Sequence, residues 1–171
     1  NPQDFELKLF VSEPNIRNPL AMSWDERGRL WVIESIDYPN NFEKERGKGN
    51  DRIKICEDTD GDGVADKFTI FKDGLNIATS LTFANDGVIV AMAPDFMFFK
   101  DTNGDDVADV EEIIMTGWSK GDTHAGPSNL QYGFDNKIWG VTGYAGYNGT
   151  VDGKRHIFGQ GLYRLKPDGT D

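Results

Sequence analysis

The chain of 171 residues has little cysteine, no long apolar run and a deficit of basic side chains. Its single cysteine, Cys56, excludes an internal disulfide and a CxxC haem or metal motif. No apolar run approaches the roughly 20 residues of a membrane span, so we expect no transmembrane helix. Its 18 Lys and Arg against 29 Asp and Glu give a net charge of −11, which argues against nucleic acid as a partner.

Apolar residues alternate with polar ones along much of the chain, and this period predicts β-strands. Turn signals rich in Gly, Asn, Asp and Pro separate the alternating segments. We predict strands or hairpins over residues 4–11, 20–34, 52–72, 78–92, 96–115, 128–142 and 161–165, and a long surface loop over 37–50. No segment shows a convincing helical period, so the sequence predicts an all-β fold.

The turns of the predicted inner hairpins recur at Gly28, Gly87 and Asn136. Four short strands per unit at this spacing indicate blades of a β-propeller, with a plain β-sandwich as the alternative. We therefore predict a partial β-propeller of two to three four-stranded antiparallel blades in a single domain, residues 1–171. The blades are assigned to residues 18–75, 76–117 and 126–171. A propeller needs at least about four blades to close, so we expect a larger parent protein.

Two acidic stretches of one pattern connect the strands of two predicted hairpins. Oxygen ligands at positions 1, 3, 5, 7 and 9, with a sharp turn at position 6, suit Ca²⁺, which takes about 6–8 oxygens. The first loop offers Asp58, Asp60, Asp62, the Val64 carbonyl and Asp66, with Gly63 at the turn. The second loop offers Asp101, Asn103, Asp105, the Val107 carbonyl and Asp109, with Asp106 at the turn and Glu112 at position 12.

These acidic loops differ from an EF-hand because their flanks are β-type and position 12 of the first loop is Thr69. We predict calcium loops on hairpins with a structural role, and a solvated acidic turn is the alternative. Calcium bound at the affinity of extracellular modules, with a Kd of about 10⁻⁴–10⁻³ M, suits the periplasm or the cell exterior. We therefore expect a periplasmic or extracellular protein.

A polar, Gly-rich stretch, Gly121–Asn129, contains His124 just before a predicted inner strand. In propellers such segments can lie near the central channel, where ligands bind. A neutral imidazole there could act as a general base. The alternative is a histidine that only hydrogen-bonds to neighbouring backbone.

Aromatic residues divide into two predicted groups. Three tryptophans recur around the inner hairpins and are expected to pack between blades, with sugar stacking as the alternative: Trp24, Trp31 and Trp139. Trp118 and Tyr147 are expected to be exposed, where they could stack on a sugar. The basic cluster Lys154–His156 is expected to be a solvated loop, and Asn148–Thr150 a turn.

Several motifs resemble known dehydrogenases. His124 followed by the segment Gly133–Trp139 and then Gly143–Gly146 resembles the soluble quinoprotein glucose/sorbosone dehydrogenases, which are six-bladed propellers. A closer resemblance is to the propeller domain of the large membrane-bound dehydrogenases of planctomycetes and verrucomicrobia. The closer resemblance covers nearly the whole chain and is carried by Trp24–Glu34, Asp51–Ile55, Asp58–Asp66 and Gly121–Asn129.

The resemblance implies a fragment of a six-bladed, quinoprotein-like sugar or alcohol dehydrogenase that uses pyrroloquinoline quinone. His124 matches the family's base, which takes the proton of the sugar hydroxyl while the quinone accepts the hydride. The family's orienting Asp is matched by Tyr144 here, and Asp122 is a candidate substitute. The family's basic cofactor-binding residues lie mostly in later blades, beyond Asp171.

The same family often carries helical repeats and a c-type cytochrome domain, so the resemblance implies a cytochrome as electron-transfer partner. The alternative function is a non-catalytic, calcium-stabilised propeller module that binds carbohydrate or protein.

Overall fold

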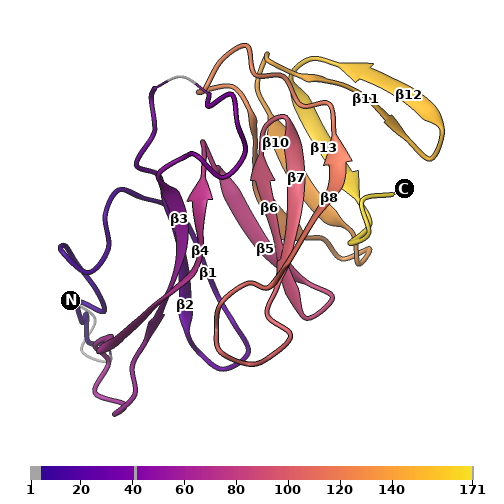
Figure 1. Cartoon of the computed structure of the whole chain (residues 1–171). Coiled ribbons are helices and arrows are strands. Elements are labelled where there is room, and N and C mark those ends of the chain that lie inside the picture. The colour runs from indigo at the N-terminus through magenta and orange to yellow at the C-terminus, as the bar shows by residue number, and fades with distance from the viewer. Residues whose placement is uncertain (1–4, 41, 171) are drawn as a thin grey trace.

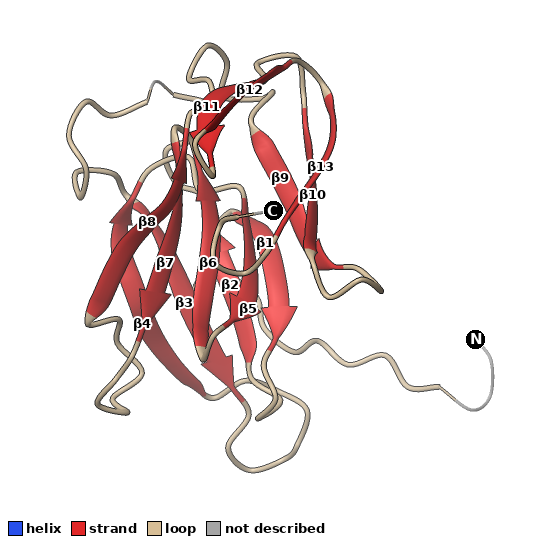
Figure 2. Cartoon of the chain, turned by 90° about the vertical axis from the view of Figure 1, so that its right-hand side faces the viewer, coloured by secondary structure: helices blue, strands red, loops and turns tan. Residues whose placement is uncertain are grey.

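The computed structural model describes residues 5–40 and 42–170, and these residues form thirteen β-strands (Figure 1). Figure 2 shows strands and loops and no helix in this part of the chain. Among the described residues no helix is long and apolar enough to cross a membrane. The predicted all-β fold class is confirmed.

Two four-stranded antiparallel sheets form the first two blades, and each runs in sequence order from one edge to the other. The first sheet contains β1 (Pro19–Trp24), β2 (Leu30–Glu34), β3 (Asp51–Glu57) and β4 (Lys67–Leu75). The second contains β5 (Ser80–Ala84), β6 (Gly87–Met92), β7 (Asp95–Lys100) and β8 (Val110–Thr116). The predicted hairpins fall inside these sheets.

The third unit is a three-stranded sheet in the order β13-β10-β9, with a separate hairpin beside it. Its strands are β9 (Pro127–Tyr132), β10 (Ile138–Thr142) and β13 (Gly161–Leu165). The hairpin consists of β11 (Tyr147–Val151) and β12 (Lys154–Phe158). The predicted turn at Asn148–Thr150 and the predicted loop at Lys154–His156 are therefore wrong, because both segments are strands.

The sheets lie side by side like the blades of a fan, with none closed into a barrel (Figure 1). The first strands of neighbouring sheets contact one another, β1 with β5 and β5 with β9. This arrangement is that of a partial β-propeller. Because the first two blades are up-and-down meanders, alternate connections emerge at opposite ends of their sheets.

The core lies between blades. One face of the first sheet packs on the second through Trp31, Ile55, Phe71, Val90 and other buried residues. The Trp31 ring lies edge-on to Phe71, with centroids 4.6 Å apart. Strand β6 is buried on both faces because its sheet lies between the first sheet and the third unit, and this explains its unbroken apolar run. Burial of a large apolar side chain such as Val or Ile contributes about 1.5–3 kcal/mol to the stability of the fold.

Three sequence-based expectations about apolar segments are corrected by the structure. The described part of the predicted first strand, residues 5–11, is not a strand, because its backbone forms no β-ladder with another strand. The apolar side chains at its C-terminal end only cover the face of the first sheet that contains Leu30, Val32 and Cys56. Trp24 is 54% exposed, with its ring edge-on to Phe10, rather than packed between blades. Trp118 and Tyr147 are buried rather than exposed, because they pack against each other and on Phe158.

Candidate functional site

The predicted site residues are divided between the two ends of the fan. His124 and Asp122 lie in the β8–β9 loop, at the same end as the β2–β3 and β10–β11 loops (the upper end in Figure 1). The acidic loops, residues 58–66 and 101–109, connect β3 to β4 and β7 to β8 at the opposite end. Any chemistry at His124 is therefore remote from the acidic loops.

His124, Asp122 and Tyr144 form a hydrogen-bonded chain. The Nδ1 atom of His124 lies 3.0 Å from Oδ1 of Asp122, and the backbone N–H of His124 donates to the same oxygen at 2.7 Å. The hydroxyl of Tyr144 donates to Oδ2 of Asp122. Asp122 therefore lies between the imidazole and the phenol and contacts both.

The hydrogen bonds of Asp122 favour its ionised form. The bond from the Tyr144 hydroxyl, followed by the bond from the His124 backbone N–H, lowers the pKa of the Asp122 carboxyl. The same bond raises the pKa of the Tyr144 phenol, because the protonated phenol donates this hydrogen bond to a carboxylate and the phenolate could not. The arrangement keeps a negative charge beside the imidazole, a charge that Tyr144 alone cannot supply.

A shallow pocket of about 280 Å³ lies beside His124. It is lined by Pro39, Asn40 and Phe42 on one side and by residues 120–124 on the other. Lys120 donates to the Glu43 carbonyl at 3.0 Å, and its ammonium lies 5.2 Å from the centre of the Phe42 ring. The pocket is close in volume to the smaller ligand sites of proteins, about 300 Å³, and it is mainly polar.

In the first acidic loop, carboxylate oxygens of Asp58, Asp60 and Asp62 all lie within 4.8 Å of one another. Asp58 accepts hydrogen bonds from the backbone N–H groups of Gly61 and Gly63, both at 2.8 Å. These bonds, led by the bond from Gly63, lower the pKa of Asp58. Three clustered carboxylate oxygens are the kind of ligand that a hard cation such as Ca²⁺ prefers.

The remaining predicted ligands of the first loop lie differently. Asp66 binds back to Thr59, accepting from its backbone N–H at 3.0 Å and from its hydroxyl at 2.7 Å. Val64 is an exposed residue whose N–H donates to Asp62 at 2.8 Å. In this geometry the carboxylate of Asp66 closes the loop.

The second acidic loop repeats the geometry of the first. Asp101 accepts from the backbone N–H groups of Gly104 at 2.7 Å and Asp106 at 2.8 Å. Asp109 holds Thr102 as Asp66 holds Thr59, with distances of 3.0 and 2.7 Å. Two further predicted ligands cap backbone N–H groups within the loop: Asn103 and Asp105. Of the other two, Val107 is exposed, and Glu112 lies on β8 opposite Phe98 rather than in the loop.

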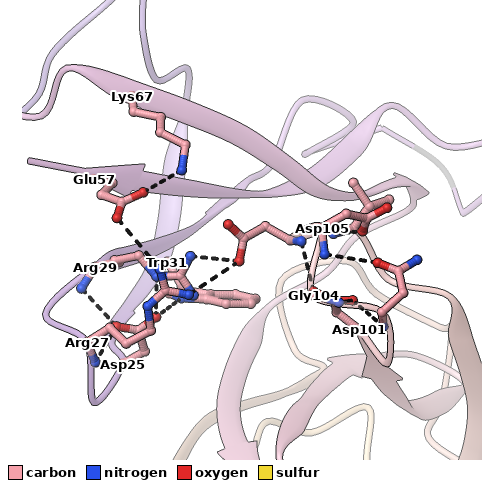
Figure 3. Close-up of polar contacts among 12 residues, drawn as sticks. Asp25, Arg27, Arg29, Trp31, Glu57, Lys67, Asp101, Gly104 and Asp105 are labelled. Carbon is pink, nitrogen blue, oxygen red and sulfur yellow. Dashed lines mark hydrogen bonds and ion pairs between the residues drawn. The ribbon is translucent and has the colours of Figure 1, made fainter. Parts of the chain in front are cut away.

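Asp106 links the second loop to the first blade, a role that the sequence alone did not reveal. Its side chain accepts from the buried Arg29 guanidinium at 2.7 Å, and Arg29 also binds Asp25 at 2.8 Å (Figure 3). Asp106 has φ = 64°, the left-handed conformation that Gly63 provides in the first loop. The sequence signal for this role is an Asp at the position where the first loop has Gly63, because Asp adopts the left-handed conformation less easily than glycine.

The fold and these sites are those of a partial β-propeller with acidic hairpin loops at one end and a histidine–carboxylate pair at the other. A family model matches residues 1–171, and the chain belongs to that family, described as Domain of unknown function (DUF7133). The search of curated proteins found no match.

Two solved structures share the fold. One is a Thermus thermophilus protein described as an oxidoreductase (glucose dehydrogenase), with a TM-score of 0.55 and 12% identity over 91% of this chain. The other is the calcium structure of a Trichoderma reesei carbohydrate-active enzyme of family AA12, with a TM-score of 0.53 and 13% identity over 81% of this chain. The aligned regions span only 46% and 32% of those chains.

Proposed function

We propose that this chain is part of a quinoprotein-like dehydrogenase that oxidises a sugar or a related alcohol. The observation that carries the proposal is the chain Tyr144–Asp122–His124, in which Nδ1 of the imidazole is held by a carboxylate. The opposite ring nitrogen, Nε2, belongs to a side chain that is 61% exposed. The resemblance in fold to a protein described as a glucose dehydrogenase supports the same reaction class.

In this proposal His124 is the general base. Nε2 accepts the proton of the substrate hydroxyl, and the charge that develops on the imidazolium is stabilised by Asp122 at Nδ1. The carboxylate also fixes which ring nitrogen carries the proton in the resting state. Tyr144 donates to the other carboxylate oxygen and so keeps Asp122 ionised and in place.

The described residues supply only part of the charge that a bound quinone would need. Pyrroloquinoline quinone would accept the hydride from the substrate carbon, and its three carboxylates call for several charged hydrogen bonds. The pocket beside His124 contains one permanent cation, Lys120. The residues described here therefore do not fit the whole quinone, and we assign to them only the proton transfer. A c-type cytochrome, in the periplasm or outside the cell, is the proposed electron acceptor.

Calorimetric titration of the full-length protein with pyrroloquinoline quinone in the presence of Ca²⁺ tests this proposal. We expect saturable binding with one quinone per propeller. Binding that is lost when the propeller is thermally unfolded would show that the folded protein is responsible. If the intact, folded protein binds no quinone, the quinoprotein function is wrong.

We also propose that the acidic loops bind Ca²⁺ and stabilise their hairpins. In the first loop the ion would be held by Asp58, Asp60 and Asp62, whose oxygens are already clustered. In the second it would be held by Asp101, Asn103 and Asp105, with Glu112 as a further carboxylate nearby in sequence. The carbonyls of Val64 and Val107, and Asp66 and Asp109 after release of their threonines, complete the proposed ligand sets.

Removal of calcium is expected to lower the melting temperature of the protein, and its return to restore it. At a free Ca²⁺ concentration of about 100 times the Kd, one site stabilises the folded state by about 2.7 kcal/mol. Differential scanning fluorimetry with a chelator and then with excess Ca²⁺ measures this change, and Mg²⁺ serves as the control ion. A melting temperature that does not respond to saturating Ca²⁺ would contradict the metal assignment.

The second candidate function is a calcium-stabilised propeller module that binds carbohydrate or protein without chemistry. Tyr144 favours it, because a phenol stands where the related enzymes carry the orienting carboxylate. Under this alternative, the full-length protein would bind sugars without oxidising them, and alanine at His124 would change affinity alone. Turnover with quinone separates the two functions.

A further inference from the structure

The contact between His124 and Asp122 does not by itself fix the plane of the imidazole ring. Both residues lie in one loop, two positions apart, and the His124 side chain is largely exposed. The Asp122 carboxylate at 3.0 Å and the Thr123 hydroxyl at 3.4 Å both approach the same ring atom, Nδ1. Hydrogen bonds at one ring atom have a broad angular preference and leave the ring free to tilt about it. A base that must meet a substrate hydroxyl at one place needs a second contact, away from Nδ1.

Tyr38, in the β2–β3 loop of the first blade, provides that second contact. Its ring lies edge-to-face with the imidazole of His124, with centroids 5.1 Å apart and planes at 72°. This is a favoured arrangement for aromatic pairs. The next residue, Pro39, accepts a hydrogen bond from the hydroxyl of Thr123 at 3.5 Å. The two loops therefore meet at the ring of His124.

The residue before this tyrosine, Asp37, anchors the β2–β3 loop. Its buried carboxylate accepts from the backbone and side chain of Asn50 at 2.9 and 2.7 Å, and from the side chain of Asn76 at 2.8 Å. Its backbone N–H donates to Asp51 at 2.8 Å, and Asp51 accepts from the Ala78 N–H at 3.1 Å. Since Asn76 and Ala78 belong to the β4–β5 connection, the loop is tied to both blades.

We propose that Tyr38 is a positioning residue for His124 and that Asp37 supports it. The inference rests on the proposed function, in which His124 acts as the base. The Tyr38 ring restricts the tilt of the imidazole from the face that Asp122 leaves open. A displacement of a catalytic group by about 1 Å costs on the order of 10²-fold in rate, so this restraint matters for turnover.

The test compares Tyr38→Ala with Tyr38→Phe in the full-length protein. Phenylalanine keeps the ring and its contact with His124, whereas alanine removes both. We expect Tyr38→Ala to lower kcat by about 10–100-fold with little change in KM, and Tyr38→Phe to stay near wild type. The ring protons of His124, followed by NMR, should lose the ring-current shift of Tyr38 in the alanine variant only.

The NMR measurement separates this inference from the proposed function, because it needs no turnover. Identical His124 ring signals in the alanine and phenylalanine variants would overturn the positioning role. If the ring signals of the two variants differ but the wild-type protein oxidises no sugar, the positioning of His124 by Tyr38 is supported and the role of His124 as base is overturned. Equal melting temperatures of the two variants would show that the differences are local.

Discussion

Replacement of His124 by alanine is expected to lower kcat/KM for sugar oxidation by about 10²–10⁴-fold, the usual contribution of a general base. The loss should fall mainly on kcat, because the proton is transferred in the transition state. Folding should be unaffected, since the side chain is largely exposed and supports no core contact. Steady-state kinetics with a redox dye, together with thermal melts, measure both effects.

The chain offers a matched control for this variant. Its other histidine, His156, is an exposed residue of β12, on the hairpin beside the third sheet. We expect His156→Ala to retain activity within about twofold, as for a surface substitution. A similar loss in both variants, or none in His124→Ala, would remove His124 from the reaction.

Replacement of Glu34 by alanine is expected to destabilise the fold by about 3–5 kcal/mol, the range for removing one partner of a buried ion pair. Glu34 is fully buried at the end of β2. It accepts from the buried Lys54 ammonium at 2.9 Å, from the Arg52 guanidinium, and from the Arg17 N–H at 2.7 Å. Alanine would leave Lys54 buried without its carboxylate.

Urea unfolding of the full-length protein measures this loss. Glu111→Ala is the control, because Glu111 of β8 pairs at 2.8 Å with Lys72 of β4 at the partly exposed surface. Such pairs are worth about 0–1 kcal/mol. Equal destabilisation by the two variants would contradict the importance of burial for the Glu34 network.

The pH dependence of the Glu34 contribution has a definite sign. Burial acts to raise the pKa of Glu34, but the hydrogen bonds from Arg52 and Lys54 outweigh it, so its pKa in the fold is lowered. A lowered pKa in the folded state gives stability that is present above the unfolded value, about 4.3, and is lost as pH falls through the folded value. The difference in stability between wild type and Glu34→Gln should therefore shrink below about pH 4.3.

Much of the strand pattern could be predicted because it is local. The sheet strands β1–β10 follow alternating or continuous apolar segments bounded by turn residues, and each acidic loop carries its proposed ligands within one short stretch. The hairpin β11–β12 could not be predicted in this way. Its strands contain Gly149, Lys154 and Arg155, and their place depends on packing against Trp118, which comes from a distant part of the chain.

The candidate site shows the same division between local and distant information. His124 and Asp122 were identified because they share one motif, and the structure places Asp122 on the imidazole. Tyr38 reaches His124 only because blades pack side by side, and no local pattern marks it. Arg29 is likewise brought to Asp106 by the contact of two blades.

In the proposed function, sugar oxidation belongs to the His124 end of the propeller, and calcium is confined to the opposite end. The most direct test is the rate of sugar-dependent dye reduction by the full-length protein as pyrroloquinoline quinone is added in the presence of Ca²⁺. We predict turnover that rises with quinone to saturation and is abolished in His124→Ala. Quinone that binds but supports no sugar-dependent reduction, or turnover that survives in His124→Ala, would contradict the proposed function.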